Sequence, residues 1–293
     1  MRIRREPGIQ VKTPAQLARM EQAGQVVAAA LRAAVDAVAP GVTTADLDDV
    51  ASARIRAAGA APSFLGYHGY PATICTSIND EIVHGIPSPS RLLRDGDLVS
   101  IDCGAIVDGW HADAAVTVPV GPVTGELTRL LAACEGALWA GLAAARPGAR
   151  LSDISHAVER YVRAAGTYGI VEDYVGHGIG SEMHMDPPVP NRGKPGRGPL
   201  LTEGMAFAVE PLLVLGRPDT RLLDDGWTVI SEDGTWSAHF EHTVAVTPDG
   251  PRVLTSQEPQ VLAAPPAPPA WLAAGAGSGP AALASTEEEA DAQ

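Results

Sequence analysis

The sequence predicts an α+β protein built from two related halves, and three observations support this. The segment Ser100–Val118 contains two β-prone runs that meet at Asp108-Gly109, which indicates a β-hairpin. Alanine-rich helical patterns precede the hairpin and recur after it. The segments 40–59 and 147–166 align with a constant offset of 107, and seven of the twenty aligned pairs are identical. We therefore expect two halves that pack about a pseudo-two-fold axis.

Length and composition indicate one main domain with short extensions. The chain has 293 residues, of which 45% are hydrophobic, enough for a sizeable core. We expect an amino-terminal arm over residues 1–12, a single domain over 13–262 and a tail over 263–293. The tail is rich in alanine, proline and glycine, lacks lysine and arginine and ends in acidic residues, which predicts disorder.

Charge and cysteine content narrow the possible partners. The formal net charge of −14 and the pI near 4.9 argue against a nucleic acid or an anionic membrane surface as a partner. The sequence shows neither a secretory h-region nor a run of about 18 apolar residues. Its three cysteines are widely spaced, as expected of reduced thiols in a cytoplasmic protein.

The first half begins with two helices. Thr13-Pro14 is typical of a helix start, and Pro40-Gly41 ends the first helix before a second one begins near Thr44. The following segment, 64–87, mixes glycines and aromatic residues with His68 and His84. Such a segment forms either simple turns or the wall of a pocket where the backbone approaches a ligand.

The hairpin places two carboxylates on one face. If Val107 faces Trp110 across the turn, then Gly104 faces Asp113, and Asp102 lies diagonal to Asp113. Diagonal positions are about 7–8 Å apart at the backbone, so the two side chains can converge on metal ions spaced about 3.5–4 Å apart. The alternative is an ordinary hairpin with polar residues on its solvent face.

The second half adds an imidazole and two more carboxylates. Gly176 and Gly178 flank His177, and His184 follows seven residues later, although this pattern alone also fits a loop histidine. Glu210 and Glu241 lie in strongly apolar strands, where a carboxylate needs a partner such as a metal ion. Together with Asp102 and Asp113, this set suits manganese, iron, cobalt or zinc.

Between these motifs, residues 187–204 are so rich in proline and glycine that we expect a surface loop.

In order along the chain, these motifs resemble the type I methionine aminopeptidases, which have the pita-bread fold. The match runs from about Thr13 to Thr247, and it is carried by GYHGYP, TSINDEIVHGIP, the hairpin with its two aspartates, GHGIG, VEP and FEHTV. The resemblance implies two pseudo-symmetric halves around a curved antiparallel sheet. It is identified as type I because the long helical insertion of type II enzymes is absent.

The resemblance implies a cofactor of two divalent metal ions, drawn from Co, Mn, Fe, Zn and Ni. Asp102 would bind one ion, His177 and Glu210 the other, while Asp113 and Glu241 would bridge both. The implied reaction removes the amino-terminal methionine, with a preference for a small second residue, by attack of a water or hydroxide that bridges the metals.

The resemblance also implies catalytic and substrate-binding residues. Glu210 would act as general base, His184 would stabilise the carbonyl oxygen, and His84 would contact the scissile amide. The methionine pocket would be lined by Tyr67, Tyr70, Cys75, Met183 and Trp227, with Phe64 near its mouth. Two residues depart from the family pattern, since phenylalanine is expected in place of Met183 and a small residue in place of Phe64.

The implied partners are peptides and nascent chains with an amino-terminal methionine, with transient association with the ribosome, and the chain is expected to be a monomer. Two alternatives remain open. One is a proline-specific aminopeptidase or dipeptidase of the same fold, and the other is a catalytically inactive binding module. Inactive relatives lose metal ligands, whereas this chain keeps all five, together with His84 and His184.

Overall fold

The computed structural model describes residues 8–262. The tail expected over residues 263–293 and most of the arm expected over residues 1–12 lie outside these described residues. The helices are α1 (Pro14–Asp36), α2 (Thr44–Ala57), α3 (Gly125–Ala144) and α4 (Leu151–Ala165), and a 3₁₀ turn, η1, spans Tyr67–Gly69.

The strands of the first half are β1 (Ala61–Pro62), β2 (Ile74–Ile78), β3 (Glu81–Val83), β4 (Leu98–Val107) and β5 (Trp110–Pro119). Those of the second half are β6 (Gly169–Ile170), β7 (Gly176–Gly178), β8 (Met185–Val189), β9 (Ala206–Val209), β10 (Leu212–Val214), β11 (Thr220–Leu222), β12 (Val229–Ser231), β13 (Ser237–His239), β14 (Glu241–Thr247), β15 (Gly250–Val253) and β16 (Gln260–Val261).

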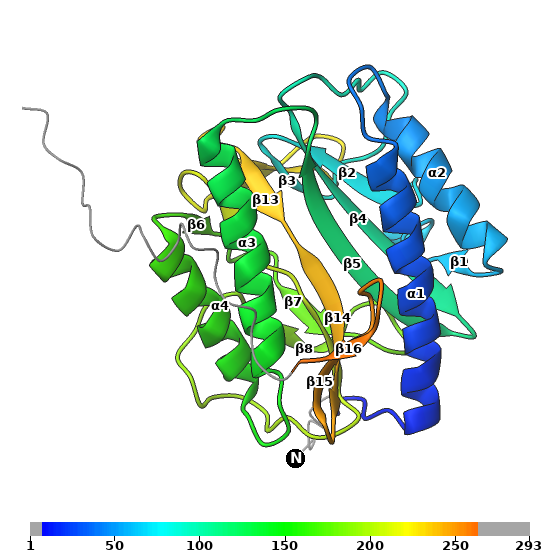
Figure 1. The fold of residues 1–293 in the computed structure, drawn as a ribbon, viewed down its shortest axis with the longest axis vertical. Coiled ribbons are helices and arrows are strands. Elements are labelled where there is room, and N and C mark those ends of the chain that lie inside the picture. Colours follow the sequence, from blue (N-terminus) through cyan, green and yellow to red (C-terminus); the bar gives the residue numbers. More distant parts are fainter. Residues whose placement is uncertain (1–7, 263–293) are drawn as a thin grey trace, which may run out of the picture.

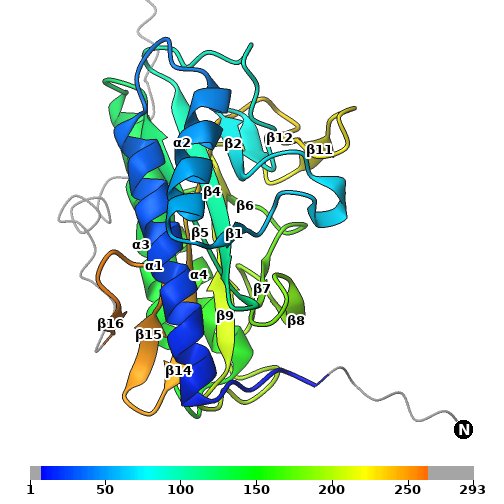
Figure 2. The ribbon, with the colours of Figure 1, turned by 90° about the vertical axis from the view of Figure 1, so that its right-hand side faces the viewer.

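Most strands join one curved antiparallel sheet of ten strands. Its main path runs β1-β4-β5-β14-β9-β7-β8, with β2 paired to β4 and β15 and β16 extending from β14. The four helices cover one face of this sheet (Figure 1). The opposite face carries β11, β12 and the loops around β7 and β8 (Figure 2). The α+β architecture predicted from the sequence is thereby confirmed.

The two halves are related in detail. The Gly41 amide donates to the Leu93 carbonyl at 2.8 Å, and the Gly148 amide, 107 residues later, donates to the Leu201 carbonyl at 2.9 Å. The helices that follow begin in the same way. The Thr43 amide donates to Asp46 at 2.8 Å, and the Arg150 amide donates to Asp153 at 2.7 Å. The predicted pair of related halves is therefore confirmed by equivalent hydrogen bonds of both kinds, between backbone groups and from a backbone amide to an aspartate side chain.

Each half has its own hydrophobic core against the shared sheet. One core joins α1 and α2 to β4 and β5, and the other joins α3 and α4 to β9 and β14. Fully buried side chains such as Ile55 and Phe207 anchor these cores, and truncating such a side chain costs about 2–5 kcal/mol. Both cores therefore hold the sheet rigidly from the face that the helices cover.

Helix α3 shows how burial accounts for an apolar segment. Among the described residues it is the one helix whose length and composition would allow it to cross a membrane. Nine of its residues are buried, and it packs against α4 and the sheet. Its apolar character is therefore explained by its position inside the core.

The second helix begins at Thr44, as expected, and Thr43 is its cap. One sequence-based expectation needs adjustment. The segment 187–204 is not wholly a loop, because Pro187, Pro188 and Val189 belong to β8, where Pro188 pairs with His177. Strand β8 lies at the end of the sheet path, and an edge strand tolerates proline because an edge amide needs no partner strand.

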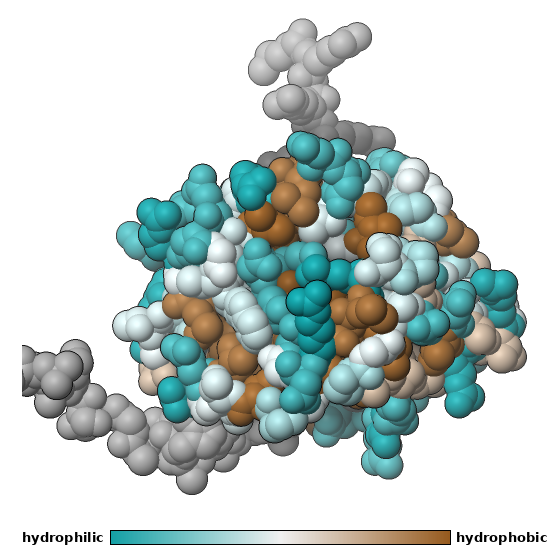
Figure 3. Space-filling model, turned by 90° about the horizontal axis from the view of Figure 1, so that it is seen from above, coloured by the Kyte–Doolittle hydropathy of each residue, from teal (hydrophilic) through white to brown (hydrophobic). Residues whose placement is uncertain are grey.

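The end of the molecule seen from above shows its hydrophobic residues as separate patches among hydrophilic ones (Figure 3).

Candidate metal centre

Thirteen side chains that the sequence singled out line one cavity. Its volume is about 120 Å³, and Val83 also contributes to its wall. The predicted residues that it brings together are Phe64, Tyr67, Tyr70, Cys75, His84, Asp102, Asp113, His177, Met183, His184, Glu210, Trp227 and Glu241. These residues come from both halves of the chain, so the cavity exists only once the two halves have packed.

The hairpin positions the first two carboxylates as its turn requires. Asp108 and Gly109 both have positive φ values, 49° and 80°, as a type I′ turn demands. Val107 pairs with Trp110 and Gly104 with Asp113, which confirms the predicted register. Asp102 and Asp113 therefore share one face of the sheet.

Strand β14 places a third carboxylate, that of Glu241, on the same face of the sheet as Asp102 and Asp113. Asp102 on β4 and Glu241 on β14 both pair with Ala115 on the intervening β5. Directly opposed residues in a sheet project to the same face, and the small Ala115 side chain leaves space between the two carboxylates. Asp113 lies two residues before Ala115 and shares this face.

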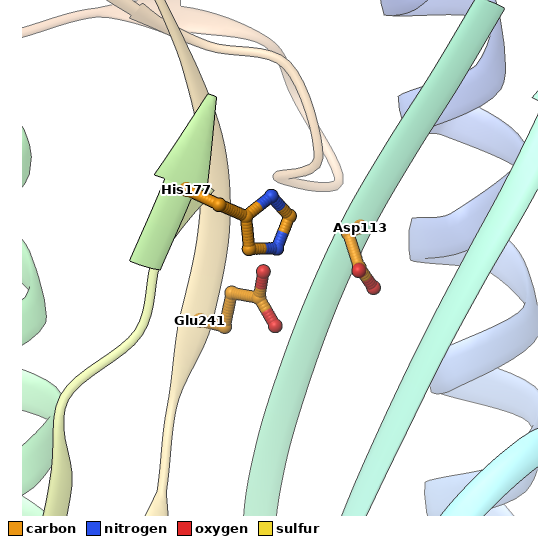
Figure 4. A group of neighbouring side chains, drawn as sticks. All are labelled: Asp113, His177 and Glu241. Atoms are coloured by element: carbon orange, nitrogen blue, oxygen red, sulfur yellow. The ribbon is translucent and has the colours of Figure 1, made fainter. Parts of the chain in front are cut away.

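The remaining two ligand candidates come from β7 and the end of β9. Val209 pairs with His242, so the next residue, Glu210, lies beside Glu241. His177 pairs with Ala208 on the other side of β9, and its Nε2 lies 3.5 Å from Oε1 of Glu210. Asp113, His177 and Glu241 extend from three strands, and His177 and Glu241 face each other (Figure 4). One candidate ligand atom from each of the three residues lies within 4.8 Å of the others.

One hydrogen bond fixes the chemical form of His177. Its Nδ1 lies 3.0 Å from the Gly178 carbonyl oxygen and donates to it. Nδ1 then holds the proton, and the Nε2 lone pair faces the carboxylates. Burial lowers the pKa of His177 to about 3, so the imidazole is neutral near pH 7, as a metal ligand must be.

The four carboxyl groups are crowded and poorly satisfied by the protein. Asp102, Asp113 and Glu241 are each at most 8% exposed. Burial raises the pKa of all four, and repulsion from neighbouring carboxylates adds to the rise at Asp102, Glu210 and Glu241. One oxygen each of Asp102, Asp113 and Glu241 is buried without a hydrogen-bond partner.

A divalent cation fits this arrangement. It would ligate the unpartnered oxygens and offset the repulsion between the carboxylates. The cluster is accordingly a buried candidate metal site of aspartate, glutamate and histidine.

Two further histidines stand beside the cluster. Nδ1 of His184 lies 2.9 Å from the Tyr67 hydroxyl, and the His184 ring centre is 4.2 Å from that of His177. His84 has a positive φ of 61°, and its ring packs edge-on against Trp227. Burial lowers the pKa of His84 to about 4, so this ring is neutral near pH 7.

An apolar wall closes one side of the cavity. Phe64, Tyr70, Cys75 and Met183 form a buried cluster, and Trp227 packs against it. The rings of Tyr70 and Trp227 meet edge to face at 5.0 Å. The Tyr70 hydroxyl lies within hydrogen-bonding distance of the Ile74 and Gly85 carbonyls, which holds this ring in place at the base of the wall.

Three residues near the cluster were not identified from the sequence. Val83 lines the cavity at the end of β3. Thr243 accepts a hydrogen bond from the Asp113 amide at 2.9 Å and donates one to the Asp113 carbonyl at 2.8 Å. His239 is 1% exposed beside Glu210 and Glu241. Its position two residues before Glu241 was an available signal, because alternate residues of an extended chain share a face.

Comparisons with known proteins give one consistent family. The model of metallopeptidase family M24 matches residues 18–248. The chain is 54% identical over 259 residues to methionine aminopeptidase 1 of Mycobacterium tuberculosis, covering 87% of this chain and 97% of that protein. It is 48% identical over 245 residues to the methionine aminopeptidase of Clostridium acetobutylicum, covering 84% and 98%.

Solved structures agree. The methionine aminopeptidase of Thermotoga maritima superposes with a TM-score of 0.83 at 38% identity, covering 85% of this chain and all of that one. The prolidase of Pyrococcus furiosus superposes with a TM-score of 0.67 at 23% identity, covering 85% of this chain but only 66% of that one. The second likeness concerns the fold alone.

The double hydrogen bond to Thr243 generates a first prediction. Thr243→Val preserves shape but leaves the buried amide and carbonyl of Asp113 without partners. We expect a loss of about 2–3 kcal/mol in the free energy of unfolding, measured by urea denaturation, and weaker metal binding by calorimetry.

Thr247→Val is the matched control, because the Thr247 hydroxyl bonds only the Gly250 carbonyl at a partly buried turn. It should cost less than about 1 kcal/mol. Equal losses for the two variants would contradict a special role for Thr243.

The raised carboxyl pKa values generate a second prediction. A carboxyl group whose pKa is higher in the folded state than in the unfolded state contributes its full stabilisation when the pH is below its unfolded-state pKa. This contribution is lost as the pH rises through the folded-state pKa. These folded values are about 7 for Asp113 and about 8 for Glu210. Protons therefore compete with a cation up to that range.

We expect the rise in melting temperature caused by Mn²⁺ to be larger at about pH 8 than at about pH 6. Chelator-stripped protein provides the baseline at each pH. A Mn²⁺-induced rise of the same size at both pH values would contradict this account of the cluster.

Proposed function

The chain belongs to metallopeptidase family M24, and from that premise we infer how its buried cluster acts: the protein is a type I methionine aminopeptidase, which removes the amino-terminal methionine of peptides. The observation that carries this function is the coincidence, in one cavity, of the ligand cluster, two neutral histidines and an apolar wall.

We propose that the cluster holds two divalent ions. Asp102 would bind one, His177 and Glu210 the other, and Asp113 and Glu241 would bridge both. The central positions of Asp113 and Glu241, whose oxygens approach each other and His177 within 4.8 Å, support their bridging role. When bound, such ions lower the pKa of water and polarise a carbonyl group.

The protein's own residues would handle the proton and the developing charge. Glu210 is the carboxylate nearest to His177, and it would accept a proton from the attacking water. Nδ1 of His184 lies 2.9 Å from the Tyr67 hydroxyl; with this hydroxyl as the donor, Nε2–H of His184 would be free to stabilise the carbonyl oxygen of the tetrahedral intermediate. His84, held neutral by burial, would contact the scissile amide.

The position of Asp102 explains why only a terminal residue would be removed. Asp102 lies directly opposite Cys75 on the neighbouring strand, so this carboxylate stands where the apolar wall meets the ligand cluster. When the first side chain of a substrate packs against the apolar wall, its free ammonium group would reach the Asp102 end of the ligand cluster. A peptide with a blocked amine cannot make this contact.

The wall is suited to an unbranched thioether side chain. Its aromatic rings and the sulfur atoms of Cys75 and Met183 offer polarisable contacts. The cavity volume of about 120 Å³ limits what enters beside the cluster, which favours a small second residue. Met183 and Phe64, which depart from the family pattern, both belong to this wall.

The alternatives are less well supported. Likeness to proline-specific enzymes is at the level of fold alone. An inactive binding module has no need of five ligand candidates in one buried cluster.

A panel of peptides tests the function. Chelator-stripped protein is reconstituted with Mn²⁺, Co²⁺ or Fe²⁺ in turn, and release of the first residue is followed from Met-Ala-Ser, Leu-Ala-Ser, an X-Pro peptide and N-acetylated Met-Ala-Ser. We expect metal-dependent release from Met-Ala-Ser alone. Asp113→Asn should lower kcat/KM more than about 100-fold, since even groups that only support a ligand contribute 10–100-fold.

Asp249→Asn, which changes an exposed carboxyl in the turn after β14, is the control and should leave kcat/KM unchanged. Cleavage of the X-Pro peptide in preference to Met-Ala-Ser would refute the methionine specificity. Absence of cleavage with every metal by a folded protein would refute the enzymatic function.

A further inference from the structure

His239 lies where the chain passes from one sheet to another. It is the last residue of β13, which pairs with β10, and Glu241 two residues later begins β14 in the large sheet. The backbone here is held tightly. The His239 amide donates to the Thr117 hydroxyl at 2.8 Å, and that hydroxyl lies 2.8 Å from the His239 carbonyl, to which it donates.

This fixed backbone aims the imidazole at the ligand cluster. Nε2 of His239 lies 3.9 Å from Oε2 of Glu210 and 3.8 Å from Oε2 of Glu241. The side chain is 1% exposed, and Nε2 is a buried atom without a hydrogen-bond partner. A buried polar nitrogen at nearly equal distances from two carboxylates needs an explanation, because a buried donor or acceptor that is left unpaired destabilises the fold.

The surroundings decide which form of the ring is stable. If Nε2 carried a lone pair, it would face two carboxylate oxygens and be repelled by both. If Nε2 carries the hydrogen, it faces two acceptors and is attracted by both. The Nε2–H tautomer is therefore the one that this position favours, and it makes His239 a donor toward Glu210 and Glu241.

We propose that His239 is a positioning residue for the metal centre: its Nε2–H, which faces Oε2 of Glu210 and Oε2 of Glu241 from 3.9 Å and 3.8 Å, attracts both carboxylates and orients them toward the cations. The proposal rests on the metal-binding role of these two glutamates in the proposed function. Groups that interact with a metal ligand but do not bind the metal fix the direction of the ligand lone pairs. Loss of such a group typically weakens metal binding by about 10–100-fold.

The same contact distinguishes the two glutamates from the two aspartates. Asp113 is fixed through its backbone by Thr243, whereas the longer glutamate side chains have more rotatable bonds to restrain. A single imidazole between the two glutamates restrains both. We therefore expect its loss to affect metal affinity more than the stability of the metal-free fold.

The test compares His239→Gln with His239→Leu. The glutamine amide retains a donor at nearly the same reach, whereas leucine retains bulk without a donor. The dissociation constant for Mn²⁺ is measured by calorimetry on chelator-stripped protein, and the visible spectrum of the Co²⁺ form reports the ligand geometry. We expect His239→Leu to weaken Mn²⁺ binding by about 10–100-fold and to alter the Co²⁺ spectrum, with His239→Gln within about 3-fold of the wild type.

His242→Leu provides the matched control. His242 is a half-buried histidine next to Glu241, but its Nδ1 lies 2.9 Å from the Thr255 hydroxyl and its ring packs on Trp139. This variant should lose stability with and without metal, and its Mn²⁺ affinity should not change. If His239→Leu does not fold, His239→Asn replaces it, since its shorter amide does not reach the glutamates.

Wild-type Mn²⁺ affinity in His239→Leu would overturn the proposal, and so would equal weakening in His239→Gln and His239→Leu. Because metal binding is measured without peptide, a failure of the aminopeptidase function would be seen separately, as absence of cleavage by protein that binds Mn²⁺ normally.

Discussion

Repulsion among four buried carboxyl groups is the constraint on which the rest of this structure depends. Asp102, Asp113, Glu210 and Glu241 converge in a space from which most water is excluded, and burial alone disfavours their ionised forms. The fold tolerates the arrangement because the surrounding sheet is held rigidly by two hydrophobic cores. Rigid backbones keep the charges together until a cation compensates them.

The duplicated architecture explains how a chain can assemble such a cluster. Asp102 and Glu210 are 108 residues apart, close to the offset of 107 that relates the two halves. Asp102 pairs with a residue of another strand in the first half, and Glu210 directly follows a paired residue of the second half. The halves meet where β5 pairs with β14. Asp113 and Glu241 lie at this seam, so the two central ligand candidates are brought together by the contact that joins the halves.

Local chemistry made part of this predictable from sequence. The hairpin register followed from Asp108-Gly109, and the helix starts followed from capping residues. The apolar setting of Glu210 and Glu241 showed that each needed a partner. In contrast, Thr243 and Val83 carry no local signal, since their importance arises from pairings between distant strands. The prolines of β8 led to the prediction of a loop. Proline is tolerated in an edge strand, and the edge position of β8 is a property of the whole sheet that the local sequence does not show.

Anomalous diffraction would test the central claim, that this carboxylate cluster is a cation site, most directly. Crystals of the protein grown with Mn²⁺ would be measured on both sides of the manganese absorption edge. The account predicts anomalous peaks inside the cavity, at coordination distance from Asp113 and Glu241. Saturating Mn²⁺ with no anomalous density there, and with the four carboxyl groups hydrogen-bonded to one another or to water, would contradict it.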